Sequence, residues 1–207
     1  MTKIKICGLF RSCDIDYVNE AKPDFCGFII DVPKSHRNVT VEQVRLLRKS
    51  LCPEIQAVGV FVDAPQELIA GLVLDGTLDL VQLHGQEDEV YIAELRKQIS
   101  VPIIKAFSVQ TSEDVRRAEE SSADCILLDH GSGGTGASFD WSLLTGLTRP
   151  YVLAGGLTPE NLPGAIKRLH PWTVDLSSGV ETDGEKDRSK ILAAVQAVRN
   201  MDLEDLP

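Results

Sequence analysis

The sequence predicts an α/β protein built as a single (β/α)8 barrel, the TIM-barrel architecture. Three observations support this prediction. Eight short apolar runs, rich in β-branched residues, follow one another along the 207 residues. Polar stretches with helical periodicity lie between these runs, so strand and helix alternate. Eight such units, each of about 20 to 30 residues, fit a closed parallel barrel better than a doubly wound sheet of about five or six strands.

The predicted strands begin with KIKIC and end with TVDLS. In chain order they span 3–7, 25–30, 55–61, 79–83, 101–107, 124–129, 151–155 and 173–177. Helical patterns between and after them span 41–51, 65–74, 90–99, 112–120, 159–169 and 186–200. Several of these patterns begin with Pro or acidic residues and end with Lys or Arg, as helices commonly do. Pro163 and Gly164 predict that the fifth helix begins late or kinks.

Length and composition favour one soluble domain over residues 1–207. The chain is 43% hydrophobic and 25% charged, and no segment approaches the roughly 18 apolar residues of a membrane span. The N-terminal segment lacks the apolar block of a signal peptide and is expected to form the first strand. We therefore expect no membrane partner.

Charge and cysteine usage indicate the cellular compartment and exclude some classes of partner. The five cysteines are scattered without CxxC spacing, which favours a reducing, cytoplasmic compartment and predicts no metal site. A net charge of −10 and a pI near 4.9 argue against a nucleic-acid surface, because such surfaces need basic patches. An anionic substrate would have to be held by local groups against this overall field.

In a barrel of this kind, the residues at the C-terminal ends of the strands face the active site. This rule produces a short set of candidates from the predicted strand ends. They are Cys7, Asp31 with the loop after it, His84, Ser108, Asp129, Gly155 with Gly156, and Ser177 with Ser178.

The last two strand ends predict a phosphate site. Gly155 and Gly156 follow the seventh strand, and Ser177, Ser178 and Gly179 follow the eighth. Glycine lets backbone N–H groups approach an anion closely, and this position is the recurrent phosphate site of the fold. Either loop alone could be only a tight turn. Their occurrence after adjacent strands favours a small phosphorylated substrate.

Cys7 and Asp129 are the predicted acid-base pair. Cys7 ends the first strand and shares a face with Lys5, whose cation would favour the thiolate, and Asp175 is the expected partner of Lys5. Asp129 is a carboxylate that closes an apolar strand. The alternatives are that Cys7 only packs in the core and that Asp129 only caps the next loop.

Arg37 and His84 are predicted to contact the substrate. Arg37 lies in the loop after the second strand, and its planar guanidinium suits a carboxylate. His84 ends the fourth strand, where it could bind ligand or only orient a loop. A solvated loop position is the alternative for Arg37.

With these residues in place, the chain resembles the phosphoribosylanthranilate isomerase family. The resemblance runs in order through KIKICGL at 3–9, CGFI, KSHRNVT, VQLHG, LLDHGSGGTGASFDW, LAGGLTPENL and VDLSSGVETDGEKD. It implies a cofactor-free Amadori rearrangement of N-(5-phosphoribosyl)anthranilate to 1-(2-carboxyphenylamino)-1-deoxyribulose 5-phosphate in tryptophan biosynthesis. It also implies Cys7 as general base, Asp129 as general acid and Arg37 as the partner of the anthranilate carboxylate.

Two residues depart from the pattern of the family. His130 stands where a small hydroxyl residue is expected, and His36 stands where proline is common. Both departures are expected to affect loop conformation more than chemistry. The oligomeric state is left open between a monomer and a homodimer.

Other functions of the same barrel stay open at this stage. A ribulose-phosphate epimerase would need metal-binding His and Asp groups, which the sequence does not show. An indole-glycerol-phosphate synthase would be expected to use a lysine acid at a strand end, whereas Cys7 and Asp129 occupy those positions here. A non-catalytic ligand-binding barrel is the alternative from another class, and the presence of both Cys7 and Asp129 argues against it.

Overall fold

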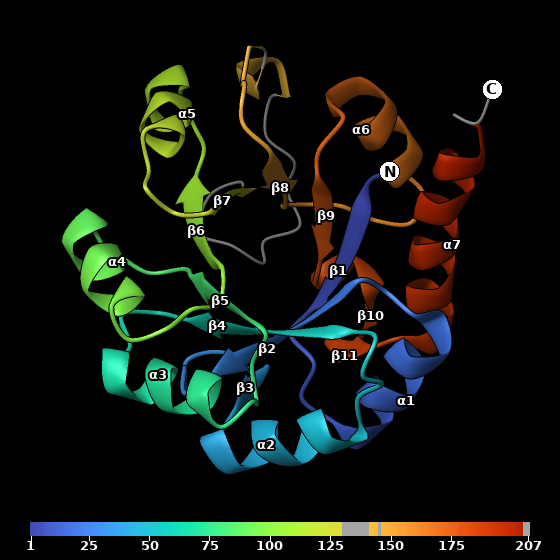
Figure 1. Cartoon of the computed structure of the whole chain (residues 1–207). Helices are drawn as coiled ribbons and strands as arrows, with labels where there is room; N and C mark the ends of the chain where they lie inside the picture. Colours follow the sequence, from blue (N-terminus) through green and yellow to red (C-terminus); the bar gives the residue numbers. More distant parts are fainter. Residues whose placement is uncertain (130–140, 145, 205–207) are drawn as a thin grey trace.

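Parallel strands close into a ring in the computed structural model, which describes residues 1–129, 141–144 and 146–204 (Figure 1). The ring runs in the order β1 (Lys3–Cys7), β2 (Phe25–Ile30), β4 (Gln56–Phe61), β5 (Leu80–Leu83), β6 (Ile103–Ser108), β7 (Cys125–Asp129), β8 (Tyr151–Leu153) and β9 (Thr173–Leu176). It closes because β1 pairs with both β2 and β9. In that closing register, Lys5 lies opposite Asp175. The predicted (β/α)8 barrel is confirmed.

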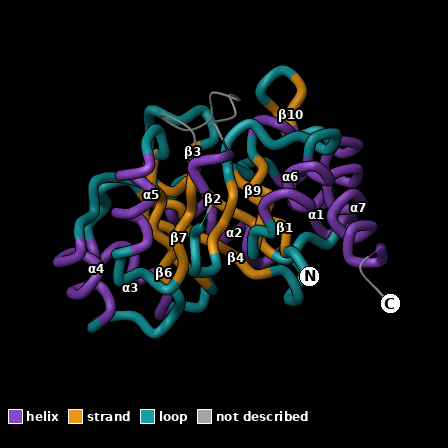
Figure 2. The backbone as a smooth tube through the Cα atoms, turned by 90° about the horizontal axis from the view of Figure 1, so that it is seen from above, coloured by secondary structure: helices purple, strands orange, loops and turns teal. Residues whose placement is uncertain are grey.

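Helices surround the strands, as the view from above shows (Figure 2). They are α1 (Ser12–Ala21), α2 (Val41–Ser50), α3 (Gln66–Leu74), α4 (Glu89–Arg96), α5 (Ser112–Glu119), α6 (Leu162–Leu169) and α7 (Arg188–Glu204). Capping boxes define two of the starts: Thr40 pairs with Gln43 before α2, and Thr111 pairs with Asp114 before α5. α7 packs against α1 and α6 and so joins the two ends of the chain.

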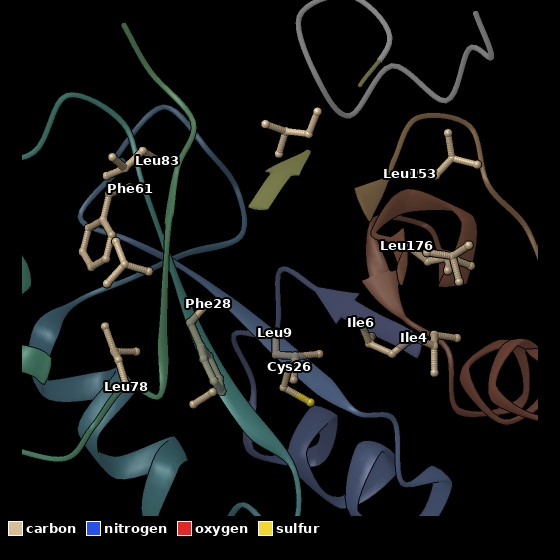
Figure 3. Packing of buried hydrophobic residues seen from close by; sticks show 14 of the residues in the cluster. Ile4, Ile6, Leu9, Cys26, Phe28, Phe61, Leu78, Leu83, Leu153 and Leu176 are labelled. Carbon is tan, nitrogen blue, oxygen red and sulfur yellow. The ribbon is translucent and has the colours of Figure 1, made fainter. Parts of the chain in front are cut away.

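Alternation along the strands separates two apolar regions. Outward residues of β1 and β2, such as Ile4, Ile6 and Phe28, are fully buried under the helices (Figure 3). Inward residues form a second apolar cluster inside the barrel: Phe25, Val58, Leu80, Ile104, Cys125, Leu127, Val152 and Ala154. This inner cluster fills the barrel below the more polar residues at the C-terminal ends of the strands.

Some elements differ from the sequence prediction. The unit after β7 has, among its described residues, only the 3-10 turn η1 (Trp141–Leu144) in place of an α-helix. Helix α1 and the short strand β3 (Asn38–Val39) were not predicted. α6 begins late, at Leu162, so Pro163 lies in its first turn, where the missing N–H costs nothing.

The chain after β9 forms a 3-10 turn and a short hairpin, which the sequence patterns did not predict. The 3-10 turn η2 (Ser178–Val180) leads into an antiparallel hairpin of β10 (Glu181–Thr182) and β11 (Glu185–Lys186). Both strands have two residues, too few for a periodic signal. Among the described residues, no helix combines the length and apolar character that a membrane span requires.

Candidate active site

A cavity of about 500 Å³ lies at the C-terminal ends of the strands. The residues predicted to act in catalysis or substrate binding line it: Cys7, Arg37, His84, Asp129, Gly155, Gly156, Ser177, Ser178 and Gly179. They come from six strand ends and the loops that follow them. The barrel therefore brings together residues that are up to 172 positions apart, from Cys7 to Gly179.

Cys7 lies above a buried ion pair. Lys5 Nζ is 2.7 Å from Asp175 Oδ2, which confirms the expected pairing across the barrel closure. Burial alone would lower the pKa of Lys5, but attraction to the Asp175 carboxylate raises it above its ordinary value, so Lys5 is a cation. Gly27 makes room for both side chains: a Cβ there would lie 2.7 Å from Cys7 Sγ and 3.1 Å from Lys5 Nζ.

The protonation state of Cys7 differs from the sequence-based expectation. Burial raises the pKa of the thiol above its ordinary value, and Lys5 and Lys186 oppose this shift without cancelling it. The prediction that Lys5 favours the thiolate is right in direction, but burial outweighs it. The free protein therefore holds Cys7 as a thiol at neutral pH.

His84 stands between Gln82 and Asp129. Its Nδ1 is 2.9 Å from Gln82 Nε2, and its Nε2 is 3.9 Å from Asp129 Oδ2. Burial lowers the pKa of His84, with a further contribution from Lys5, so the imidazole is neutral at pH 7. A neutral imidazole beside the carboxyl group can exchange hydrogen bonds with it or with a ligand, without adding a charge.

The two glycine-containing loops lie in direct contact. Gly155 and Gly156 adopt φ of 90° and 63°, a region that favours glycine. A Cβ at Gly179 would lie 1.9 Å from the Leu157 carbonyl oxygen, so only glycine permits this approach of the two backbones. Asn161 braces the first loop by accepting from Thr158 N–H and donating to the Gly156 carbonyl oxygen.

These loops leave backbone donors for an anion. Within the described part of the chain, the N–H groups of Gly155 and Gly156 have no backbone carbonyl partner. Both residues line the cavity together with Ser177 and Ser178. The arrangement can bind a phosphate through N–H groups and hydroxyls without a lysine.

Arg37 lines the cavity and is held by an acidic partner. Its Nε and Nη2 each lie 2.7 Å from an oxygen of Glu181, in a bidentate pair. Lys186 Nζ lies 2.5 Å from the same carboxylate and 3.0 Å from the Ser177 carbonyl oxygen. The hydrogen bonds that Arg37 donates to Glu181 raise the pKa of Arg37 above its ordinary value. Burial would raise the pKa of Glu181, but Arg37 and Lys186 hold it below its ordinary value.

The remaining strand-end candidates, Asp31 and Ser108, lie outside this cavity. Asp31 does not line this cavity, although the loop after it does, including His36. Ser108 lines a neighbouring cavity that also touches His84 and Asp129. His130 lies outside the described residues. In the parts of the chain that the structure describes, no group of three or more His, Cys, Asp or Glu side chains could hold a metal ion.

Sequence reasoning missed four residues of the site. Gln82 lies one layer below His84, where strand alternation could have placed it. Glu181 and Lys186 belong to the unpredicted hairpin, and Asn161 lies in a loop. No signal in the sequence indicates that Glu181 pairs with Arg37, because the two are 144 positions apart.

Comparison with known proteins gives one consistent result. The family described as N-(5'-phosphoribosyl)anthranilate (PRA) isomerase matches residues 4–197. The N-(5'-phosphoribosyl)anthranilate isomerase of Endomicrobium trichonymphae is 45% identical over 205 residues, covering 97% of this chain and 100% of the relative. The corresponding protein of Acetivibrio thermocellus is 43% identical over 215 residues, covering 98% of each chain.

Solved structures agree with these sequence matches. The phosphoribosyl anthranilate isomerase of Thermus thermophilus is 30% identical, with a TM-score of 0.86, over 97% of this chain and 100% of the other. A second isomerase structure, 34% identical with a TM-score of 0.84 and the same coverage, holds reduced 1-(o-carboxyphenylamino)-1-deoxyribulose 5-phosphate. That ligand carries both a carboxylate and a phosphate.

Proposed function

The chain belongs to the N-(5'-phosphoribosyl)anthranilate isomerase family, and from this premise we propose that it catalyses the Amadori rearrangement of N-(5-phosphoribosyl)anthranilate in tryptophan biosynthesis. One observation carries the proposal beyond family membership. A single cavity holds a thiol, a carboxyl group, an arginine and two glycine loops, the groups that this substrate and this reaction require.

Substrate binding is proposed to use the two ends of the cavity. The loops that contain Gly155, Gly156, Ser177, Ser178 and Gly179 bind the phosphate through backbone N–H groups and hydroxyls. At the other end, Arg37 receives the anthranilate carboxylate through its free N–H groups. Holding both anions fixes the sugar between Cys7 and Asp129, and this orientation is itself a large part of catalysis.

The first chemical step is assigned to Asp129. Its carboxylic acid donates a proton to the ribose ring oxygen, the bond from that oxygen to C1 breaks, and a positively charged iminium forms at C1 and the nitrogen. His84 is placed beside this carboxyl group, and its neutral ring can hydrogen-bond the acid or the opening sugar. We assign His84 to substrate binding.

The second step is assigned to Cys7. The iminium makes the C2 proton acidic, and the Cys7 thiolate removes it to give an enolamine that tautomerises to the ketone. Exchange with solvent then returns the proton from Cys7 to Asp129. Because the free protein holds Cys7 as a thiol, the reactive thiolate is the minor form at neutral pH.

The domain organisation and cellular compartment are inferred from composition and charge. We infer that residues 1–207 act as one catalytic domain in the cytoplasm, without a nucleic-acid partner, because the chain is acidic and its cysteines are scattered. One solved relative is a set of monomers generated from the dimeric enzyme of Thermotoga maritima, with 34% identity and a TM-score of 0.85. A monomer and a homodimer are both consistent with this barrel.

An isomerase assay tests the function. Freshly made phosphoribosylanthranilate is mixed with the protein, and the loss of anthranilate-type fluorescence is followed before and after exhaustive chelation. We expect turnover in both samples, since the chemistry moves only protons. No turnover would contradict the proposed function, and activity that is lost on chelation and restored by zinc or magnesium would contradict the metal-free mechanism.

A further inference from the structure

Arg37 is held by a buried ion network of Glu181 and Lys186 that takes no part in the proposed reaction. The Arg37 side chain lines the cavity, whereas Glu181 and Lys186 are not among the residues that line it. The exposed fractions of the side chains fall from 12% for Arg37 to 5% for Glu181 and 0% for Lys186. The carboxylate therefore approaches the guanidinium from the protein side, away from the cavity.

The hydrogen-bond pattern leaves one edge of the guanidinium for a ligand. Glu181 occupies the Nε–H and one Nη2–H of Arg37. A guanidinium has five N–H donors, and none of the described residues accepts a side-chain hydrogen bond from Nη1. The remaining Nη1 and Nη2 donors form a second planar fork, which matches another carboxylate bidentately.

Glu181 is itself fixed in place. Lys186 Nζ donates to its carboxylate, and Lys190 Nζ lies 2.6 Å from its carbonyl oxygen. If the Glu181 carboxylate swung away, the fully buried Lys186 cation would lose its charged partner, which is strongly unfavourable. The network of Arg37, Glu181 and Lys186 also keeps a net charge of about +1, so its two cations outweigh the repulsion between Glu181 and an incoming carboxylate.

We propose that Glu181, clamped by Lys186, is a positioning residue that orients Arg37 so that the second fork of its guanidinium faces the carboxylate of the substrate. This inference rests on the proposed function, because it takes Arg37 as the carboxylate contact. It explains why the unpredicted hairpin of β10 and β11 follows the phosphate loop directly: the hairpin carries both residues of the clamp.

Two ligands that differ by one carboxylate test the proposal. Affinities are measured for reduced 1-(o-carboxyphenylamino)-1-deoxyribulose 5-phosphate and for the phenylamino compound that lacks the carboxyl group. The wild-type protein should prefer the first ligand, and Arg37→Ala should abolish this preference. Glu181→Gln should reduce the preference about tenfold, the scale of one charged hydrogen bond, and the ratio of the two affinities cancels any effect on the phosphate that both ligands share.

Two further variants separate orientation from charge and folding. Glu185→Gln makes the same substitution on the same hairpin at an exposed residue that pairs with Arg11, and should change neither affinity. The double variant Glu181→Gln with Lys186→Met leaves no buried orphan cation and restores the net charge of the network. Positioning predicts that its preference for the carboxylate stays reduced.

The contrary outcomes are distinct. Tighter binding of the carboxylate ligand by Glu181→Gln would mean that Glu181 occupies the place of the ligand, which overturns the proposal. Recovery of the preference in the double variant would reduce Glu181 to a charge partner and also overturn it. Full preference in Arg37→Ala would refute the proposed carboxylate contact and this inference with it, whereas loss in Arg37→Ala but not in Glu181→Gln would refute this inference alone.

Discussion

Cys7 experiences two opposing influences at the end of β1. Burial disfavours the thiolate, while the Lys5 and Lys186 cations favour it, and burial is the larger effect. Gly27 on the neighbouring strand leaves just enough room for the thiol above Lys5. The reactivity of this residue therefore depends on the small volume around it as much as on its charged neighbours.

The raised pKa of Cys7 has a consequence for pH dependence. A general base must be deprotonated, so its activity grows as pH rises toward the pKa of the thiol in the folded protein. We expect the limb of kcat/KM that belongs to Cys7 to keep rising above neutral pH. The thiolate absorbance of Cys7, obtained by subtracting the pH titration of Cys7→Ser from that of the wild type, should follow the same limb. A thiol already fully ionised at pH 7 would contradict this expectation.

Gly27→Ala tests the space around the thiol. The new Cβ would meet Cys7 Sγ at 2.7 Å, closer than carbon and sulfur can approach, so Cys7 or Lys5 must move. We expect kcat to fall by about 10- to 100-fold, since displacements near 1 Å are costly for catalysis. Steady-state kinetics measure this. Gly71→Ala, where a Cβ meets nothing within 4 Å, is the control, and equal kinetics in both variants would refute the account.

At the scale of elements, the proposed phosphate site is a contact between two loops. The loop after β8 and the turn η2 after β9 approach so closely that Gly179 has no room for a side chain against Leu157. Asn161 fixes the first loop, and Lys186 donates to the Ser177 carbonyl oxygen in the second. These hydrogen bonds fix the N–H groups that are proposed to bind the phosphate.

Gly179→Ala should damage this contact. A Cβ at 1.9 Å from the Leu157 carbonyl oxygen forces the backbone of one loop to shift. We expect KM and the dissociation constant of the reduced product analogue to rise about tenfold or more, because misoriented donors lose hydrogen bonds to the phosphate. Gly164→Ala in α6 lies in open space and serves as the control. Unchanged affinity in Gly179→Ala would show that the two loops do not depend on their contact.

The sequence predicted the main elements and the strand-end residues because both follow from local patterns. Cys7 and Asp129 close apolar strands, and a closed parallel barrel brings strand ends together. The clamp of Glu181 and Lys186 could not be predicted, because two-residue strands carry no periodicity and the partner of Glu181 lies far along the chain. The net pKa shift of Cys7 was missed for a different reason: burial depends on packing that a sequence does not show.

At the scale of the whole molecule, the barrel separates stability from chemistry. The apolar cluster inside the strands and the layer beneath the helices contain the buried hydrophobic residues, while the charged groups of the site lie above them. The closure between β1 and β9 joins Lys5 to Asp175, residues 170 positions apart. One ring thus supports both the proposed acid-base residues and the proposed phosphate loops.

The contribution of the helix layer to stability can be tested with substitutions outside the site. Leu72 and Leu74 both lie on α3, but Leu72 is 1% exposed and Leu74 is 77% exposed. Leu72→Ala should lower the free energy of unfolding by about 2 to 5 kcal/mol, because it removes buried methyl groups and leaves a cavity. Leu74→Ala should change it by no more than about 0.5 kcal/mol. Urea unfolding measures both, and equal destabilisation would contradict the assignment of α3 to the core layer.

The most direct test of the mechanism is kcat in Cys7→Ser and Asp129→Asn. An alcohol is too weak a base at neutral pH and an amide delivers no useful proton, so each variant should lose about 10²- to 10⁴-fold or more in kcat. The double variant should be little worse than either single variant, as residues that act as a unit are non-additive. Circular dichroism and the affinity for the reduced product analogue should stay near the wild-type values. Near-normal turnover in a folded single variant would contradict the acid-base assignment.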